Sequence, residues 1–481
     1  MTMLTPVDHE GLESIAERMS KLATHDPHRL LVSCGDQHVT AIQLEHESNR
    51  LAHYFRRLGV ETDDFVTIAM PNGIRYVESV LAIWKAGAVP APVSPRLPGT
   101  EMESIIELTD PSLVLGVDPD RLPRRVCLPV DYSVPIDIDA SPHVYRFARY
   151  SRAPTSGGST GRPKLIIDKR PAAVYGDPLL PHDSEVVIPG PLYHTAPFSL
   201  VTRSVLQGNH TTIFERFDPE ATLATVHRTR ATFLYAVPTM MSRMWKLPTD
   251  VKARYDLSSL STLFHSAAPC PEWLKRAWIE VLGDAVVEMY SSSEGAAKFI
   301  IKGHEWLMRP GSVGRPRPGD AVRILDDEGR EVPVGTIGNV YMRSEGDRDF
   351  VYKGADAPAR IDGFVTVGDM GHVDSDGYLY LADRRKDLII RGGANIFPAE
   401  VEATLEAHPA VRSVAVVGIP DDDLGQRVHA VVDSPEGVPV DELRAFVAAR
   451  LVSYKCPTSY EFVDGPVRDE AGKVRRSALL G

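Results

Sequence analysis

Short apolar runs alternate with longer amphipathic segments along the first half of the chain. The clearest example has an apolar run at 65–70, an amphipathic segment at 74–86 and a second apolar run at 89–93. This order predicts a strand, a helix and a parallel strand, which together form a βαβ unit. Further continuously apolar runs predict strands covered on both faces, at 185–188, 211–214, 231–237, 260–265 and 285–290. The first half is therefore expected to form a large α/β domain of stacked sheets.

Helix and turn signals complete this picture. Thr40 and Gln43 form a capping-box pattern, which predicts a helix that continues to Gly59. Turns rich in Asp and Gly separate three short expected strands at 322–325, 338–343 and 378–382, which indicates a small β-rich subdomain. The last hundred or so residues are enough for a small α+β domain with its own core. Its expected helices are at 400–406 (begun by Pro398) and 441–451, and its expected strands are at 413–419 and 427–432.

Composition and charge narrow the possible partners. Of 481 residues, 43% are hydrophobic and 25% are charged, and the formal net charge of −12 argues against nucleic acid or an anionic membrane as the main partner. The four cysteines are far apart and predict neither a disulfide framework nor a zinc cluster. The N-terminal segment lacks a signal-peptide pattern, and no apolar run is long enough to span a bilayer. We therefore expect a cytoplasmic protein without a transmembrane segment.

A loop rich in glycine and hydroxyl residues carries the strongest chemical signal. It consists of Thr155, Ser156, Gly157, Gly158, Ser159, Thr160, Gly161, Arg162, Pro163 and Lys164. Glycine lets backbone N–H groups approach an oxyanion closely, while hydroxyl groups and cations add donors. A Walker A loop has Ser or Thr after its lysine, whereas here Leu165 follows. The sequence predicts a phosphate clamp between two extended segments, with a flexible surface connection as the alternative.

Three further segments carry side chains suited to nucleotide chemistry. Tyr290 and Glu294 follow a strand expected to be buried, where a ring can stack on a purine and a carboxylate can bind Mg²⁺. Asp369 can accept the hydroxyl groups of a ribose, with Arg384 as a matching donor. Lys473 follows a glycine near the C terminus and can neutralise negative charge that develops in a site. Taken singly, the turn after Tyr290 and the tail at Lys473 are better explained as solvated segments, and the signal at Asp369 is weak.

Combined in this order, the four segments resemble the adenylate-forming superfamily of acyl- and aryl-CoA ligases. The resemblance extends from about Leu44 to Lys473 and includes further matches at 191–197, 267–269, 391–402 and 454–457. It implies an AMP-binding domain at 1–384 and a small mobile domain at 385–481. It also implies that a carboxylate attacks the α-phosphorus of ATP to give an acyl adenylate and pyrophosphate, after which a thiol displaces AMP.

The resemblance implies roles for single residues that bind the nucleotide. The loop from Thr155 to Lys164 is expected to grip the β- and γ-phosphates. Ser293 is expected to contact the α-phosphate, and Glu294 to hold Mg²⁺. The expected adenine contacts are Ala267, Ala268, Pro269 and the stacked ring of Tyr290, and the expected ribose contacts are Asp369 and Arg384. Two departures from the family pattern, Ser291 and Asp383 where glycine is usual, are expected to change local backbone freedom.

Other implied roles belong to the reaction. Lys473 matches the lysine that bridges the carboxylate and the α-phosphate, and Lys386 lies where the family has its hinge. The expected tunnel for the thiol is formed by Arg391, Gly392, Gly393 and Ala394. The expected pocket for the acid is formed by His194, Tyr235, Phe264, His265 and Ser291, where His194 is either a catalytic gate or a packing residue. Because no Asp is placed for an amino-acid ammonium, a non-amino-acid carboxylate is favoured.

The leading prediction is an ATP-dependent carboxylic acid–CoA ligase that uses ATP, Mg²⁺ and CoA. The nearest alternative hands the same acyl group to an amine, and a further one hands it to a separate carrier protein. A light-emitting oxygenase has no specific support, and a non-enzymatic relative is disfavoured because Lys473 and Glu294 are both present. The expected partners are small molecules, and a homodimer is compatible with the sequence.

Overall fold

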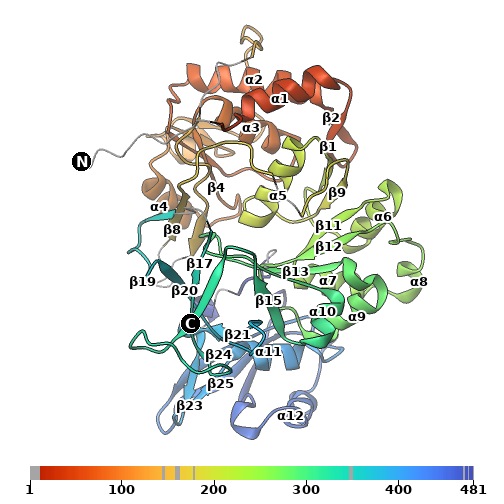
Figure 1. The fold of residues 1–481 in the computed structure, drawn as a ribbon, viewed down its shortest axis with the longest axis vertical. Coiled ribbons are helices and arrows are strands. Elements are labelled where there is room, and N and C mark those ends of the chain that lie inside the picture. The colour runs from red at the N-terminus through yellow and green to blue at the C-terminus, as the bar shows by residue number, and fades with distance from the viewer. Residues whose placement is uncertain are drawn as a thin grey trace.

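The computed structural model describes residues 11–142, 147–157, 163–176, 179–345, 350–469, 472–474 and 476–479. It contains a large N-terminal domain and a small C-terminal one, coloured blue at the bottom of Figure 1. The large domain is built from stacked sheets and helices, as expected. None of the helices within the described ranges is both long and apolar enough to cross a membrane.

Parallel strands form the centre of the main sheet. In spatial order they are β13 (Val286–Tyr290), β12 (Thr262–His265), β11 (Phe233–Ala236), β9 (Glu185–Ile188), β10 (His210–Ile213) and β1 (Leu30–Cys34), with β2 (Gln37–Thr40) antiparallel at the edge. The connecting helices are α5 (Thr195–Leu206), α6 (Pro219–Thr229), α7 (Pro238–Trp245), α8 (Thr249–Lys252) and α9 (Glu272–Leu282). Each strand expected from an apolar run is present, with its ends moved by no more than a few residues. The carboxyl ends of these parallel strands meet at one edge, where ligands gather in open α/β sheets.

A second sheet confirms the predicted βαβ unit. Its strands are β4 (Val89–Pro92), β3 (Phe65–Ile68), β5 (Leu113–Leu115) and β6 (Cys127–Leu128), and α3 (Ile74–Lys85) connects β3 to the parallel β4. The surrounding helices are α1 (Ile15–His25), α2 (Ala41–Arg57) and α4 (Gly99–Thr109). At the start of α2 the backbone N–H of Thr40 donates to Gln43 Oε1 at 2.9 Å, so the capping box is formed.

The glycine-rich loop connects two extended segments, as predicted. These are β7 (Thr155–Gly157) and β8 (Pro163–Asp168), an antiparallel pair completed by β18 (Phe350–Lys353). Gly158, Ser159, Thr160, Gly161 and Arg162 lie outside the described residues, and the phosphate clamp stays a prediction.

The β-rich part continues the main sheet. Its strands are β14 (Phe299–Lys302), β15 (Ser312–Pro316), β21 (Leu379–Arg384), β20 (Phe364–Val373), β17 (Gly338–Arg343) and β16 (Ala321–Leu325), with β19 (Arg360–Ile361) beside β20 and α10 (Gly303–Met308) after β14. β14 pairs with β13, the strand that ends at Tyr290. One continuous sheet therefore connects Tyr290 to the paired strands that carry Asp369 and Arg384.

The C-terminal domain has its own core and a mixed three-stranded sheet. Its elements are β22 (Ile389–Arg391), β23 (Ala394–Ile396), α11 (Pro398–Glu406), β24 (Ser413–Asp421), β25 (Gly425–Asp433), α12 (Val440–Ala448) and β26 (Ser459–Phe462). Val401, Leu405, Val414, Val428 and Leu443 are buried together between the helices and the sheet. Only α12 is clearly shorter than its predicted range of 441–451. The one-turn helix Arg385–Asp387 links the two parts, and the boundary after residue 384 stays a prediction.

Candidate active site

Strand ends of the main sheet supply the first side chains of the site. β13 ends at Tyr290 and β12 ends at His265, and these parallel strands are neighbours. After β12, Ala267 adopts a φ of 77°, a left-handed conformation that is uncommon for a residue with a Cβ. After β13, the hydroxyl of Ser293 lies 3.1 Å from that of Thr195 at the start of α5. The backbone therefore turns directly after β12 and β13, and the residues of these turns lie at the carboxyl edge of the sheet.

Tyr290, Asp369 and Arg384 form one connected group. Asp369 and Arg384 are cross-strand partners in β20 and β21, and Arg384 Nε lies 3.3 Å from Asp369 Oδ1. The phenol of Tyr290 donates to Asp369 Oδ2 at 2.6 Å. Burial, and then the negative charge of Asp369, raise the pKa of Tyr290 well above its ordinary value. A neutral aromatic ring is thus fixed beside a carboxylate that still has lone pairs to accept hydroxyl groups.

Glu294 is held by two side chains from the clamp sheet. The phenol of Tyr352 donates to Glu294 Oε1 at 2.6 Å, and Lys164 Nζ lies 3.5 Å from the same oxygen. The ammonium of Lys164 also lies 3.5 Å from the centre of the Tyr352 ring, a cation–π contact. Burial raises the pKa of Tyr352, and the charge of Glu294 adds to that effect. The second flank of the glycine-rich loop therefore reaches the turn that follows β13.

This environment fits Mg²⁺ only together with a nucleotide. Across the described residues, no cluster of three or more His, Cys, Asp or Glu side chains could hold a metal ion. Mg²⁺, however, is commonly bound by one or two carboxylates together with substrate phosphates and water. Glu294, with one carboxylate oxygen not engaged by Tyr352 or Lys164, matches that requirement beside a phosphate-binding loop.

Lys473 of the C-terminal domain reaches the same region. A Cβ added to the preceding Gly472 would lie 3.5 Å from Ala268, so this turn packs on the large domain. The side chain of Lys473 is exposed overall, yet the protein around its ammonium lowers its pKa. Asp469 opposes that shift, Arg384 adds to it, and Glu294 opposes it. Lys473 is therefore within electrostatic range of both Glu294 and Arg384.

His194 lies at the same place, just before α5. Its Nε2 atom is buried and has no hydrogen-bond partner in the described structure. Burial lowers the pKa of His194 to about 3, and the nearby Lys473 contributes. The imidazole is therefore neutral at physiological pH, and one nitrogen is available for a ligand.

The other expected pocket residues divide into two groups. The rings of Tyr235 and Phe264 lie with their centres 6.1 Å apart, and the phenol of Tyr235 lies 3.5 Å from the hydroxyl of Ser266. Ser291 donates its hydroxyl to the carbonyl of Ala297 at 2.8 Å, which closes the turn after β13. The first two therefore provide apolar surface, while the hydroxyl of Ser291 is used by the backbone.

His265 lies apart from Phe264, because successive strand residues point to opposite faces. It pairs across the sheet with Glu288, which forms a buried ion pair with Lys275 of α9. Burial lowers the pKa of His265 to about 4, and neither ring nitrogen has a partner in the described structure. Sequence analysis missed this buried charged cluster, since Lys275 and Glu288 meet only through the packing of α9 on β13.

The expected thiol-tunnel residues form a hairpin in the C-terminal domain. Gly392 and Gly393 both have positive φ, 55° and 82°, between β22 and β23. Arg391 donates to the carbonyl of Tyr454 at 2.7 Å, and Gly392 donates to that of Leu424 at 2.8 Å. These contacts lie within the C-terminal domain. The backbone of Lys386 lies in the linking one-turn helix, and its side chain is outside the described part.

Tyr352 is a further site residue that the sequence did not reveal. No local motif surrounds it, and its role depends on the antiparallel register that pairs Tyr352 with Ile166 and Lys353 with Leu165. Local sequence does not reveal this register, because β18 and β8 are almost two hundred positions apart in the chain.

Comparisons with known proteins identify the family to which this chain belongs. The model of the family described as AMP-binding enzyme matches residues 19–144 and 153–352, and that of the AMP-binding enzyme C-terminal domain matches 400–473. A feruloyl-CoA synthase from an Amycolatopsis species is 31% identical, over 98% of this chain and 99% of that protein.

Solved structures show the same fold. The o-succinylbenzoate CoA synthetase of Bacillus subtilis has a TM-score of 0.83 at 24% identity, over 96% of this chain and 98% of that chain. The amide bond synthetase of Marinactinospora thermotolerans has a TM-score of 0.80 at 27% identity, over 97% of this chain and 98% of that chain. The chain therefore belongs to the AMP-binding enzyme family, the adenylate-forming superfamily, and is an AMP-forming ligase.

Proposed function

We propose that this enzyme is an ATP-dependent carboxylic acid–CoA ligase that works through an acyl adenylate and releases pyrophosphate and AMP. The observation that carries the proposal is the packing of the turn of Lys473 on Ala268 and Thr239 of the large domain, where the charges of Glu294 and Arg384 also act on its ammonium. A cation delivered by the small domain beside the nucleotide-binding edge of the large one suits a reaction between two anions.

In this proposal the large domain binds ATP. Tyr290 stacks on the adenine beside the backbone of 267–269, and Asp369 with Arg384 binds the ribose. Ser293 donates to the α-phosphate, and the loop from Thr155 to Lys164 binds the outer phosphates. The close contact of Tyr290 with Asp369 supports a shared position for base and sugar.

The adenylation step joins the acid to AMP. A carboxylate oxygen attacks the α-phosphorus, a new C–O–P linkage forms, and the bond to pyrophosphate breaks. Lys473 reduces the repulsion between the carboxylate and the phosphate as they approach, which lowers the barrier chiefly through charge and positioning. Mg²⁺ bound at Glu294 would supply further neutralisation of phosphate charge. The neutral imidazole of His194 can donate or accept one hydrogen bond to the bound acid.

CoA is the favoured acceptor. The similarity to a feruloyl-CoA synthase over nearly the whole chain supports a thioester product and an aryl or other apolar acid. The apolar surface of Tyr235 and Phe264 supports the same class of acid. An amine is the second candidate acceptor, favoured by the similarity to an amide bond synthetase. The hinge at Lys386, the thiol tunnel at 391–394, a cytoplasmic location and a homodimer stay predictions.

A two-stage screen tests the proposal. The first stage measures pyrophosphate release from ATP across carboxylic acids, with Glu294→Gln as a matched variant that keeps side-chain size but loses charge. The second stage adds CoA or amines to the best acid and determines product masses. A thioester formed faster than any amide is the expected result. Amide formation with no thioester would overturn the choice of CoA, and no acid-dependent pyrophosphate release would overturn the reaction itself.

A further inference from the structure

The turn that carries Lys473 is organised by its own backbone. Gly472 donates to the carbonyl of Asp469 at 2.9 Å, and Asp469 donates to that of Lys473 at 2.9 Å. The backbone N–H of Lys473 donates to Asp469 Oδ1 at 2.9 Å. An isolated bridge between Arg468 and Val474 closes the turn. These bonds shape the turn but do not fix it to the rest of the C-terminal domain.

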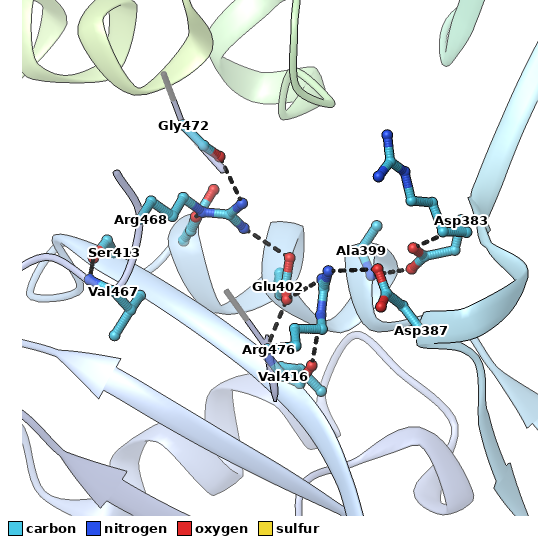
Figure 2. Close-up of polar contacts among 12 residues, drawn as sticks. Asp383, Asp387, Ala399, Glu402, Ser413, Val416, Val467, Arg468, Gly472 and Arg476 are labelled. Atoms are coloured by element: carbon cyan, nitrogen blue, oxygen red, sulfur yellow. Dashed lines mark hydrogen bonds and ion pairs between the residues drawn. The ribbon is translucent and has the colours of Figure 1, made fainter. Parts of the chain in front are cut away.

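A single buried carboxylate, Glu402 of α11, binds the chain on both sides of this turn. Arg468 Nη2 donates to Glu402 Oε2 at 2.7 Å, and Arg476 Nη2 donates to Glu402 Oε1 at 2.6 Å. Figure 2 shows the two guanidinium groups approaching Glu402 from opposite sides. Arg468 Nη1 also donates to the carbonyl of Gly472 at 3.3 Å, next to Lys473. The connection from Glu402 to the reactive lysine thus passes through one side chain.

The same group extends to the junction between the domains. Arg476 Nη1 donates to Asp387 at 3.0 Å, at the end of the linking helix Arg385–Asp387. Arg468 Nε donates to Glu406 at 3.1 Å. The Glu402 side chain is only 4% exposed. Because charge-assisted bonds among buried groups are strong and directional, this cluster holds the turn at one orientation relative to α11.

The charges around Lys473 give a physical reason to hold its turn in place. Arg384 has the same charge as Lys473 and contributes to the lowering of its pKa, so the two cations repel each other. Asp469 and Glu294 attract the same ammonium, so the position of Lys473 among these charges depends on how its turn is held. In the predicted domain rotation the turn also leaves with its domain and returns to the same position. A rigid connection to α11 meets both needs.

We propose that Glu402 is a positioning residue that acts through Arg468 and Arg476 to hold the Lys473 turn in place for adenylation. The carboxylate touches no substrate. Its effect on the rate is exerted through the position of Lys473, and a displacement of about 1 Å in a reacting group can cost about a hundredfold in rate. The inference rests on the adenylation chemistry proposed above but not on the identity of the acceptor.

Two variants test the anchor. Glu402→Gln keeps the shape of the side chain and removes its charge, and Arg468→Lys keeps the charge but loses the donor to Gly472. The matched control is Glu400→Gln on the same helix, whose carboxylate binds Lys455 at 2.6 Å and does not contact the turn. Single-turnover adenylation should fall about tenfold or more for both test variants and stay within about twofold for the control. Hydrogen exchange at the amides of Gly472 and Lys473 should become faster in the test variants alone.

A double-mutant cycle separates positioning from general damage. In a Lys473→Ala background, Glu402→Gln should change the residual adenylation rate by less than about twofold, since the group it positions is gone. Thioester or amide formation from supplied acyl adenylate should change little in Glu402→Gln. An equal fractional loss with and without Lys473, or unchanged exchange at the turn despite lost activity, would overturn the proposal. If wild-type enzyme shows no acid-dependent adenylation, the proposed function fails, and the exchange measurement still tests the anchor.

Discussion

Replacing Lys473 by alanine is the most direct perturbation of the proposed reaction. A unit charge about 4 Å from a phosphate is worth about 1 kcal/mol in bulk water and about 4 kcal/mol at an effective dielectric of 20. Because the side chain of Lys473 is exposed, the interaction energy should be below about 4 kcal/mol. Because the surrounding protein lowers the pKa of its ammonium, the energy should exceed the value of about 1 kcal/mol for bulk water. We therefore expect a loss of about 2–3 kcal/mol in transition-state stabilisation, which is about 30- to 160-fold in the adenylation rate.

The assay must separate the two half-reactions. Single-turnover formation of acyl adenylate, without an acceptor, reports the first step, and supplied acyl adenylate with CoA reports the second. Lys473→Ala should slow only the first, because the lysine is needed where carboxylate and phosphate meet. The matched control is Lys302→Ala, which removes an exposed lysine at the end of β14. Equal loss in both half-reactions would refute the assignment of Lys473 to adenylation.

Three other perturbations test separate parts of the structure. Lys386→Pro should stiffen the linking helix and slow thioester formation more than adenylation, and an unchanged ratio of the two rates would count against a hinge there. Tyr352→Phe removes the donor to Glu294 but keeps the ring beneath Lys164, so the Mg²⁺ concentration for half-maximal adenylation should rise about tenfold. No change in that concentration would mean that Tyr352 does not orient the carboxylate. Burial raises the pKa of Glu78 from 4.5 to about 7, so the folded protein favours its protonated form and loses stability as the pH rises from about 4.5 to about 7. Glu78→Gln should accordingly be more stable than wild type by up to about 3 kcal/mol at pH 8 and equal to it below pH 4.5. Urea unfolding measures this difference in the free energy of unfolding. A difference that does not depend on pH would contradict the raised pKa of Glu78.

The fold was predictable where local pattern and burial agree. The strand 185–188 and the helix after Thr40 follow from apolar runs and a capping signal that need no knowledge of distant residues. Asp369 was expected to be a buried carboxylate next to glycine, and it lies inside the ten-residue strand Phe364–Val373, directly after Gly368 with its φ of 88°. Its partnership with Arg384 depends on an irregular register between β20 and β21 that local sequence does not specify.

The site was predictable only in part for the same reason. Tyr290, Glu294 and Lys473 belong to recognisable motifs, whereas Tyr352 and Glu402 act through contacts between distant segments. His265 shows how strand alternation separates two neighbouring residues of the predicted pocket. Its neighbour Phe264 faces Tyr235, but alternation along β12 turns His265 toward Glu288 and away from that aromatic pair. Sequence motifs thus indicated residues for chemical roles, whereas the contacts of Tyr352 depend on strand pairing and those of Glu402 on the packing of α11 against Arg468 and Arg476.

The contacts between the domains indicate how readily the C-terminal domain can change its orientation relative to the large domain. Lys246 Nζ, after α7, donates to the carbonyl of Val411 at 2.8 Å, and the backbone N–H of Ala399 donates to Asp383 Oδ2 at 2.9 Å. Bonds of this kind contribute about 1–3 kcal/mol each. A bound nucleotide or acyl adenylate needs a differential affinity of only a few kcal/mol to shift such an equilibrium between two orientations. Among the described residues, the hydrogen bonds that Arg468 and Arg476 donate to Glu402, Glu406 and Asp387 lie within the C-terminal domain. Rotation about Lys386 would therefore carry the Lys473 turn away as part of the small domain, without breaking the bonds that shape it.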